Sequence, residues 1–251
     1  MSTSVSSSGY PLKLAARSAV AERTIEFRFL KPAEFRFKAG QSMDLTLNDP
    51  PQTDAEGNTR AFSINSAPDE AELIFTTRVR DTAFKRVLSS MPLGTMISAQ
   101  GPFGDFTLHN NVARPAILLA GGIGVTPFRS IARTAARQKL PHRITLFYSN
   151  RRPRDAPFLD EFRWLEQGNP NFIFVPTMTQ ASHSEWTGET GHIDRELLGR
   201  HTHRTAPGDT SGSPPIFYVA GPPTMVAALR TTLNGIGIDD DDIRTEEFSG
   251  Y

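Results

Sequence analysis

The stretch AILLAGGIGVTPF, residues 116–128, decides the fold class of the second half of the chain. Its first five residues are apolar and predict a short buried strand, and residues 125–138 predict a helix. Thr126 is a candidate cap for that helix, and Pro127 suits its first turn because the first N–H groups of a helix have no partner within it. A strand, a glycine turn and a helix N-terminus in this order aim N–H groups and a positive dipole at one point, which suits a pyrophosphate.

The glycines of this turn are open to a second interpretation. The stretch matches neither GxGxxG nor GxxxxGK, so the glycines can serve only to let strand and helix pack tightly. A turn of related pattern follows the apolar run 216–220, where Gly221 leads into a helix that opens at Pro222 or Pro223. In a parallel sheet both turns lie at the carboxyl ends of their strands, the edge where ligands bind. Two such turns in one domain favour a dinucleotide ligand more strongly than a single turn would.

Strand and helix patterns alternate throughout the second half. Further strand patterns occupy 143–149, 172–178, 215–220 and a short last stretch 242–248, and helix patterns occupy 156–167, 192–200 and 223–236. This alternation predicts an α/β domain whose parallel sheet is covered on both faces.

The first half has a different texture, with short β-type runs separated by turn residues. The six runs are residues 11–20, 24–30, 42–48, 60–66, 72–79 and 95–101. One helix-like insert, 81–91, falls between the fifth and the sixth. Six strands without a long helix predict an antiparallel barrel or sandwich. We place the boundary near residues 109–113 and expect two domains, 1–110 and 111–251, as the length of 251 residues favours.

Composition excludes several function classes. The formal net charge is zero, which favours neither nucleic acid nor an anionic membrane as a partner. Cysteine is absent, which removes disulfides, thiol nucleophiles and Cys-ligated metal centres. No window approaches the ~18 uncharged apolar residues of a membrane span, and no secretory signal is visible, so we expect a cytoplasmic protein. His201 and His203 form an HxH pair in a loop without a third ligand, so we expect no metal site.

A third signal lies in the first half, at Arg60-Ala61-Phe62-Ser63-Ile64. An arginine offers a forked donor for a phosphate, and strand alternation puts Arg60, Phe62 and Ile64 on one face. The same sequence pattern is also typical of an ordinary strand with one exposed charged residue and no ligand.

Taken together, the motifs resemble the ferredoxin–NADP reductase superfamily. The order is a barrel, RAFS, GPFG at 101–104, GGIGVTP at 121–127, AGPPTM at 220–225 and a terminal acid–x–aromatic element, and the resemblance runs from about Leu12 to Tyr251. It implies a six-stranded Greek-key β-barrel that holds FAD, followed by an α/β parallel-sheet domain that holds NAD(P)H.

The resemblance implies an FAD site in the barrel. Its residues are Arg60, Ala61, Phe62, Ser63, Ile64, Thr77, Arg78, Val79, Thr82, Ala83, Phe84 and Lys85. Arg60 would bind the pyrophosphate, Phe62 would stack on the flavin where tyrosine is commoner, and Ser63 would bind near flavin N5. The family's Gly-x-x-Ser/Thr is replaced at residues 82–85, so Lys85 would either supply charge to the pyrophosphate or simply be solvated.

A nicotinamide nucleotide site is implied in the second domain. Its residues are Gly121, Gly122, Gly124, Val125, Thr126, Pro127, Ser149, Arg151, Arg152, Gly221, Pro222 and Met225. Thr126 would lie near the nicotinamide ribose, and Ala220 replaces the cysteine that the family places beside the nicotinamide. NADPH-selective members bind the 2′-phosphate at the positions of Ser149, Arg151 and Arg152, which favours NADPH over NADH as the coenzyme. The alternative is that the arginines form a solvated surface cluster with no role in coenzyme choice.

The chain ends in two aromatic residues. By the resemblance, Phe248 would cover the flavin face that receives the nicotinamide, with Glu246 as the acid that precedes it, and Tyr251 would reach the FAD adenine. The opposite assignment, with Tyr251 over the flavin, stays open. The expected catalytic residues are thus Ser63, Glu246 and Phe248.

The expected function is hydride transfer from NADPH to FAD, followed by electron release to a separate acceptor protein such as ferredoxin or flavodoxin. Basic residues near the flavin edge, among them Arg36, Lys38, Lys85 and Arg86, could meet the acidic surface of such a carrier. We expect a monomer. Two alternatives stay open: a reductase of a small diffusible acceptor, and a non-catalytic electron-transfer protein that docks on an oxidase or dehydrogenase, which Ala220 keeps plausible.

Overall fold

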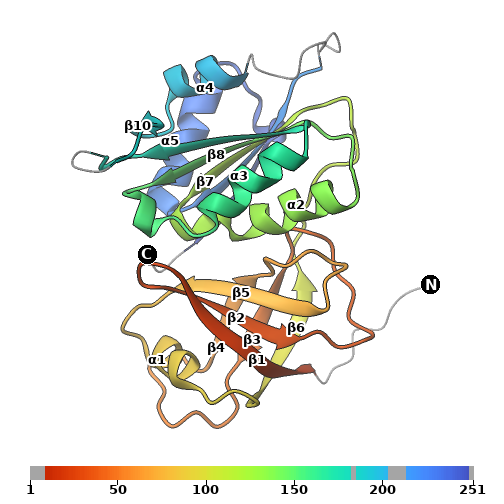
Figure 1. Ribbon diagram of the computed structural model, residues 1–251, viewed down its shortest axis with the longest axis vertical. Helices are drawn as coiled ribbons and strands as arrows, with labels where there is room; N and C mark the ends of the chain where they lie inside the picture. Colours follow the sequence, from red (N-terminus) through yellow and green to blue (C-terminus); the bar gives the residue numbers. More distant parts are fainter. Residues whose placement is uncertain (1–8, 182–184, 203–212, 249–251) are drawn as a thin grey trace.

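The computed structural model describes residues 9–181, 185–202 and 213–248. Figure 1 shows two bodies along the long axis, the first half of the chain below and the second half above. Each is built on a six-stranded sheet. The sheets divide the chain between Phe103, where the last strand of the first sheet ends, and Ala116, where the second sheet begins, and the expected boundary at residue 110 lies in this connection.

The first sheet is antiparallel throughout, as the sequence predicts, with the strand order β4-β3-β6-β1-β2-β5. Its elements are β1 (Tyr10–Ala21), β2 (Thr24–Leu30), β3 (Ser42–Thr46), β4 (Thr59–Ser63), β5 (Glu72–Arg78), helix α1 (Ala83–Ser90) and β6 (Met96–Phe103). The two end strands approach one another, because the Asn65 N–H donates to the Ile74 carbonyl at 2.9 Å just beyond β4. The sheet therefore curls around a core of its inward side chains.

That core explains the alternation seen in the sequence. Its fully buried members include Leu12, Leu14, Phe27, Phe29 and Phe75, every second residue of three strands. Helix α1 adds Phe84, Val87 and Leu88 from one face. Burial of each such side chain contributes roughly 1.5–3 kcal/mol, so α1 is held by packing and not by its own eight residues.

The second sheet is parallel throughout, with the order β10-β9-β8-β7-β11-β12. Its strands are β7 (Ala116–Gly121), β8 (Ile144–Asn150), β9 (Phe172–Met178), β10 (Glu189–Thr190), β11 (Ile216–Gly221) and β12 (Ile243–Glu247). Its helices are α2 (Thr126–Arg137), α3 (Leu159–Gly168), α4 (Arg195–Thr202) and α5 (Pro223–Asn234), with 3-10 turns η1 (Gly122–Val125), η2 (Pro153–Asp155) and η3 (Asp240–Asp242). The chain winds outward from β7 to β10 and returns to β11 on the other side of β7. The switch point of the sheet thus lies between β7 and β11, where such folds bind ligands.

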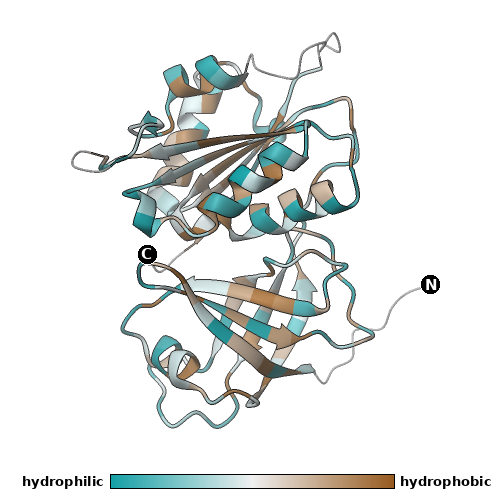
Figure 2. Cartoon of the chain, viewed as in Figure 1, coloured by the Kyte–Doolittle hydropathy of each residue, from teal (hydrophilic) through white to brown (hydrophobic). Residues whose placement is uncertain are grey.

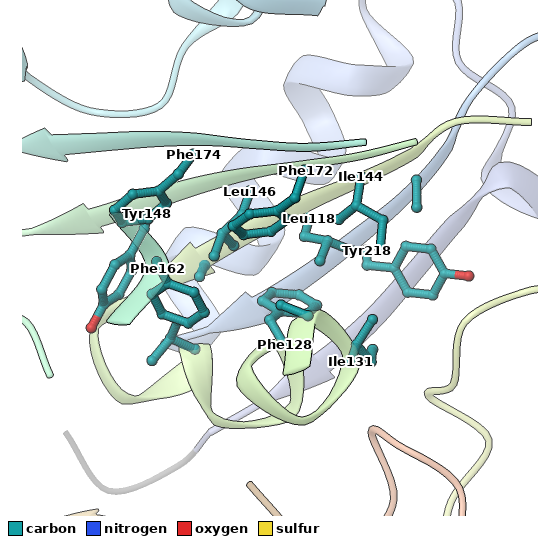
Figure 3. Packing of buried hydrophobic residues seen from close by; sticks show 14 of the residues in the cluster. Leu118, Phe128, Ile131, Ile144, Leu146, Tyr148, Phe162, Phe172, Phe174 and Tyr218 are labelled. Atoms are coloured by element: carbon teal, nitrogen blue, oxygen red, sulfur yellow. The ribbon is translucent and has the colours of Figure 1, made fainter. Parts of the chain in front are cut away.

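Helices cover both faces of this sheet, as predicted. Figure 3 shows Phe128 of α2 and Phe162 of α3 against the strand residues Leu118, Leu146 and Phe172. On the opposite face, α4 and α5 pack on a separate cluster of strand side chains. Figure 2 shows hydrophobic residues along the strands and hydrophilic ones on the outer turns of the helices.

Helix α2 fastens the two bodies together. The Ser130 hydroxyl donates to the Ser66 carbonyl at 2.6 Å, and Arg133 pairs with Glu70. Arg129 is buried and pairs with Glu26 of the first body at 3.6 Å and with Glu161 of α3 at 2.8 Å. These contacts hold the end of β4 against the glycine turn that precedes α2.

Three details differ from the sequence-based expectations. Helix α3 begins at Leu159 and not at residue 156, because Phe158 has a left-handed φ of 64°. Thr126 is not a cap: it is the first residue of α2, and its hydroxyl donates to the Ile123 carbonyl at 3.1 Å. The short strand β10 was not expected. Within the described residues, no helix is long and apolar enough to cross a membrane.

Candidate functional site

The glycine turn after β7 brings two strand ends into close contact. A Cβ on Gly124 would stand 2.5 Å from the backbone carbonyl oxygen of Ala220, so tight packing requires glycine at this position. A Cβ on Gly121 would meet the flexible end of the Met225 side chain, which can move aside. Gly121 and Gly122, the latter with a φ of 50°, line a cleft. Both interpretations of the sequence therefore apply to this turn: Gly124 allows tight packing, and Gly121 and Gly122 face a cleft.

That cleft is the larger of two, about 790 Å³, within the range of small-molecule sites. It opens between the two bodies. Among its lining residues are Arg78 and Val79 from the barrel and, from the second body, Gly121, Gly122, Ser149, Arg151, Arg152, Pro222 and Met225, all expected at a nicotinamide nucleotide or FAD site. The sequence interpretation missed Asn150, Thr179 and His192, which also line the cleft and carry no motif.

The arginines of this cleft are not equivalent. Arg152 forms a two-pronged ion pair with Asp155, at 2.9 and 3.2 Å, which is the first cause of its raised pKa. Arg78 donates to the Asp155 carbonyl at 2.9 Å. Arg151 is exposed, and among the described residues its guanidinium has no bound acceptor. Arg151 and the half-buried Ser149 are therefore available to donate to a phosphate, and Arg23 and Arg80 line the same cleft.

The smaller cleft, about 250 Å³, lies at the end of the barrel. The predicted residues that line it are Arg60, Ala61, Phe62, Ser63, Thr77, Arg78, Thr82, Lys85, Thr126 and Phe248. It is also lined by Glu56, Thr76, Arg80 and Ile123, which the sequence interpretation missed. Arg78 lines both clefts, so the two adjoin.

One end of the smaller cleft is positively charged. Helix α1 begins there, with Thr82 as its N-cap accepting from the Lys85 N–H at 3.3 Å. Arg60, Arg80 and Lys85 surround this helix end. Burial, and then the neighbouring arginines, lower the pKa of Lys85 to about 8. An anion bound here would favour the charged ammonium, so the cluster suits a pyrophosphate.

Behind Ser63, which lines this cleft, lies a carboxyl group that lines neither cleft. The Ser63 hydroxyl donates to Glu246 Oε1 at 3.5 Å, and burial raises the pKa of Glu246 to about 7. Glu246 Oε2 is buried without a hydrogen-bond partner within the described part of the chain. Glu246 is placed by the parallel pairing of β12 with β11, opposite Ala220. This carboxyl can hold or release a proton at neutral pH.

Phe248 follows β12 and lines the smaller cleft. Its N–H donates to the Gly221 carbonyl at 2.9 Å, which ties the strand end to the second glycine turn. Its half-buried ring packs at the margin of the α/β core. The predictions for Tyr251 and for His203 fall outside the described residues.

Several predicted residues place no side chain in either cleft. Ile64, Phe84 and Val125 are fully buried in the cores, and Phe84 stacks on Phe62 at 5.9 Å between ring centroids. The others are Ala83, Gly124, Pro127, Gly221 and the predicted catalytic residue Glu246. Apart from Glu246, their part in a site is limited to shaping it or offering backbone groups.

The residues present fit FAD on this structure's own geometry. The cationic end at α1 places a guanidinium and an ammonium group beside a helix N-terminus, although Asp54 and Glu56 hold the Arg60 guanidinium and the first helix N–H in this structure, and Phe62 lines the same cleft. The unpaired Oε2 of Glu246 leaves a buried polar atom behind Ser63, which lines the cleft.

Comparison with known proteins agrees with this arrangement. The family described as Oxidoreductase NAD-binding domain matches residues 118–231. One component of the Na(+)-translocating NADH-quinone reductase of Serratia proteamaculans is 31% identical over 209 residues, 78% of this chain and 50% of that protein. The reductase component of propane 2-monooxygenase from Mycolicibacterium smegmatis is 26% identical over 231 residues, 90% of this chain and 63% of that protein.

The fold matches as well. A ferredoxin NADP+ reductase from Neisseria gonorrhoeae, solved with bound FAD and NADP, superposes with a TM-score of 0.78 at 24% identity, over 96% of this chain and 99% of that one. At that identity the likeness shows the fold alone. The chain spans about half the length of the Serratia protein. Sequence match, domain order and the two adjoining clefts together place the chain in the ferredoxin–NADP reductase superfamily of FAD-dependent NAD(P)H oxidoreductases.

Proposed function

We propose that the chain transfers hydride from NADPH to FAD and passes the electrons to a separate acceptor protein such as a ferredoxin or flavodoxin. The observation that carries this proposal is the junction of the two clefts, where Arg78 lines both and Phe248 stands at the glycine turns. On this proposal, a nicotinamide entering from the larger cleft meets Phe248 at the flavin site.

FAD would be held in the smaller cleft. Arg60, Lys85 and the N-terminus of α1 bind its pyrophosphate, and Phe62 stacks on its ring system. The segment from Thr77 to Val79 would contact the ribityl chain and the phosphates. When bound, FAD would accept one hydride, which carries two electrons, and could release these electrons one at a time.

Ser63 and Glu246 act on protons at this site. The Ser63 hydroxyl already donates to Glu246 Oε1, so its oxygen remains available to accept from a ligand N–H. With a pKa of about 7, Glu246 is present in both protonation states at neutral pH. The pair can therefore exchange a proton with the cleft without a metal or a thiol.

Phe248 excludes water and controls access. Its ring covers the place where nicotinamide must lie, so it has to move when the nucleotide binds and returns when the nucleotide leaves. A rigid backbone link to Gly221 lets the ring rotate while the strand end stays in place.

Preference for NADPH rests on Ser149 and Arg151. Both line the larger cleft at the end of β8. Arg152 contributes less than the sequence suggests, because Asp155 already holds its guanidinium. The Serratia relative belongs to an NADH-quinone reductase, so the preference is a feature to test in this chain.

An acceptor protein is supported by the reductase component of the Mycolicibacterium monooxygenase among the relatives. Two of the basic residues that we expect to contact the acceptor protein already have partners. Arg36 donates to neighbouring backbone carbonyls, and Arg86 pairs with Asp81. Lys85 lines the FAD cleft. Lys38 and the outer edges of Arg36 and Arg86 are the more accessible contacts for an acidic carrier.

Anaerobic titration with NADPH and with NADH, followed at the flavin absorbance, tests the proposal. We expect bleaching by NADPH at lower concentration than by NADH. Cytochrome c reduction with and without added ferredoxin or flavodoxin then identifies the acceptor class, because a rate independent of the carrier points to a small diffusible acceptor. Purified protein that takes up no FAD, or FAD that neither nucleotide bleaches, contradicts the proposal.

A further inference from the structure

The loop between β3 and β4 carries two carboxylates that bind the groups we assign to the FAD pyrophosphate. We call residues 54–56 the acidic loop. Arg60 Nη2 donates to Glu56 Oε2 at 2.8 Å and to Asp54 Oδ1 at 3.3 Å. Arg60 Nη1 donates to the carbonyls of Glu56 and Thr59 at 2.8 and 2.7 Å. Both terminal nitrogens of the guanidinium thus donate to the protein's own acceptors.

The second oxygen of Asp54 reaches the helix. Asp54 Oδ2 accepts from the Ala83 N–H at 2.9 Å, and Ala83 is the first residue of α1. That bond is the first cause of the lowered pKa of Asp54. One carboxylate therefore bridges an arginine and a helix N-terminus, which is the pair of donors that a phosphate uses.

The acidic loop also narrows the cleft and can leave it. Glu56 is part of the wall of a cleft whose 250 Å³ lies just below the about 300–1,000 Å³ of typical ligand sites. The side chain of Glu56 is 69% exposed, and residues 51–56 are all exposed. Nothing lies within 4 Å of a Cβ placed on Gly57. Moving the loop outward therefore breaks polar contacts and uncovers no core.

We propose that the acidic loop is an internal competitor of the FAD pyrophosphate, which releases Arg60 and the α1 N-terminus when FAD binds and reclaims them when FAD leaves. The inference rests on the proposed FAD site. It assigns Asp54 and Glu56 to the control of FAD affinity and exchange. Exposed ion pairs contribute little each, so the effect is moderate and graded with the number of carboxylates removed.

FAD binding to flavin-free protein, followed by quenching of flavin fluorescence, tests the competition without any turnover. We expect E56Q to bind FAD about two- to fivefold more tightly than the native chain, and the double variant D54N/E56Q about tenfold more tightly. E56Q changes only an exposed side chain, so it tests the idea even if loss of the Asp54 charge weakens α1. Riboflavin, which lacks the pyrophosphate, should bind all variants alike.

The matched control is D81N. Asp81 pairs with Arg86 on the same helix and touches neither Arg60 nor the Ala83 N–H. We expect FAD affinity within about twofold of the native value for this variant. Equal affinities for the native chain and D54N/E56Q, or an equal gain in D81N, overturn the competition. If the native chain and every variant bind no FAD, the proposed function fails instead.

Discussion

The Ser63 hydroxyl donates to Glu246 across 183 positions of sequence, at 3.5 Å, while the other oxygen of that carboxyl is buried without a partner in the described structure. A strand end of the barrel and the last strand of the α/β sheet thus supply the two halves of one polar pair. The contact exists only when both domains are folded and docked.

The buried carboxyl of Glu246 makes stability depend on pH. Its pKa is raised from 4.5 to about 7, so the folded chain binds this proton more tightly than the unfolded chain. The stabilisation is fully present below pH 4.5 and is lost as pH rises through 7, on the order of 1–3 kcal/mol. We expect E246Q to remove this part of the pH dependence. Thermal unfolding at pH 5 and pH 8 measures it, and an unchanged dependence in E246Q contradicts the assignment.

We proposed that Phe248 controls the entry of the nicotinamide. We expect Phe248→Ala to improve access for both nucleotides and to narrow the preference between them, because the ring no longer has to be displaced. The ratio of kcat/KM for NADPH over NADH measures this, with Phe248→Tyr as a control that keeps a ring in place. A ratio that does not differ between the two variants counts against a gating role.

Much of the fold could be predicted from local pattern. Period-two alternation predicted the six barrel strands, and apolar runs followed by glycine turns predicted the parallel sheet and its ligand edge. The start of α3 could not be predicted, because the left-handed backbone of Phe158 carries no sequence signal of its own.

The site was less accessible to sequence reasoning. Residues such as Arg60 and Gly122 belong to motifs, whereas Glu56 and Asp54 lie in an ordinary polar loop whose contacts depend on how the chain returns to α1. The ion pair between Arg152 and Asp155 is local in sequence. The sequence pattern alone does not show which arginine of a cluster is already paired. Long-range pairing and charge satisfaction are properties of the folded chain.

Arg151 and Arg152 should respond differently to removal. We expect Arg151→Ala to weaken NADPH binding about ten- to hundredfold, the value of a charge-assisted hydrogen bond, and to leave NADH binding unchanged. Arg152→Ala should act on both nucleotides alike, because Arg152 holds Asp155 and the wall of the cleft. Isothermal titration with each nucleotide separates the two. A selective NADPH loss in Arg152→Ala alone reverses the assignment.

Lys85 should couple FAD binding to protons. Its pKa is about 8, and a bound pyrophosphate favours the charged form. FAD affinity should therefore not change with pH up to about pH 7 and should fall as pH rises above 8. In Lys85→Arg the charge persists at every accessible pH, and the fall should disappear. Flavin-fluorescence titrations from pH 6.5 to 9.5 provide the measurement. Parallel pH curves for the two proteins place Lys85 outside the pyrophosphate contact.

Arg129 should matter more than any exposed ion pair between the domains. It is 4% exposed, and its partner Glu26 is 2% exposed, so Arg129→Met removes one of the two cations of a buried carboxylate and leaves Arg28 at 2.9 Å as the other. The buried Asn65 carbonyl also loses the hydrogen bond that Arg129 donates to it. We expect a loss of about 1–3 kcal/mol in unfolding free energy. Arg137→Ala breaks the exposed pair with Asp69 on the same helix and should cost at most about 1 kcal/mol. Thermal unfolding of both variants measures the two losses. Equal losses would mean that burial of the Arg129 contacts adds nothing to the hold between the domains.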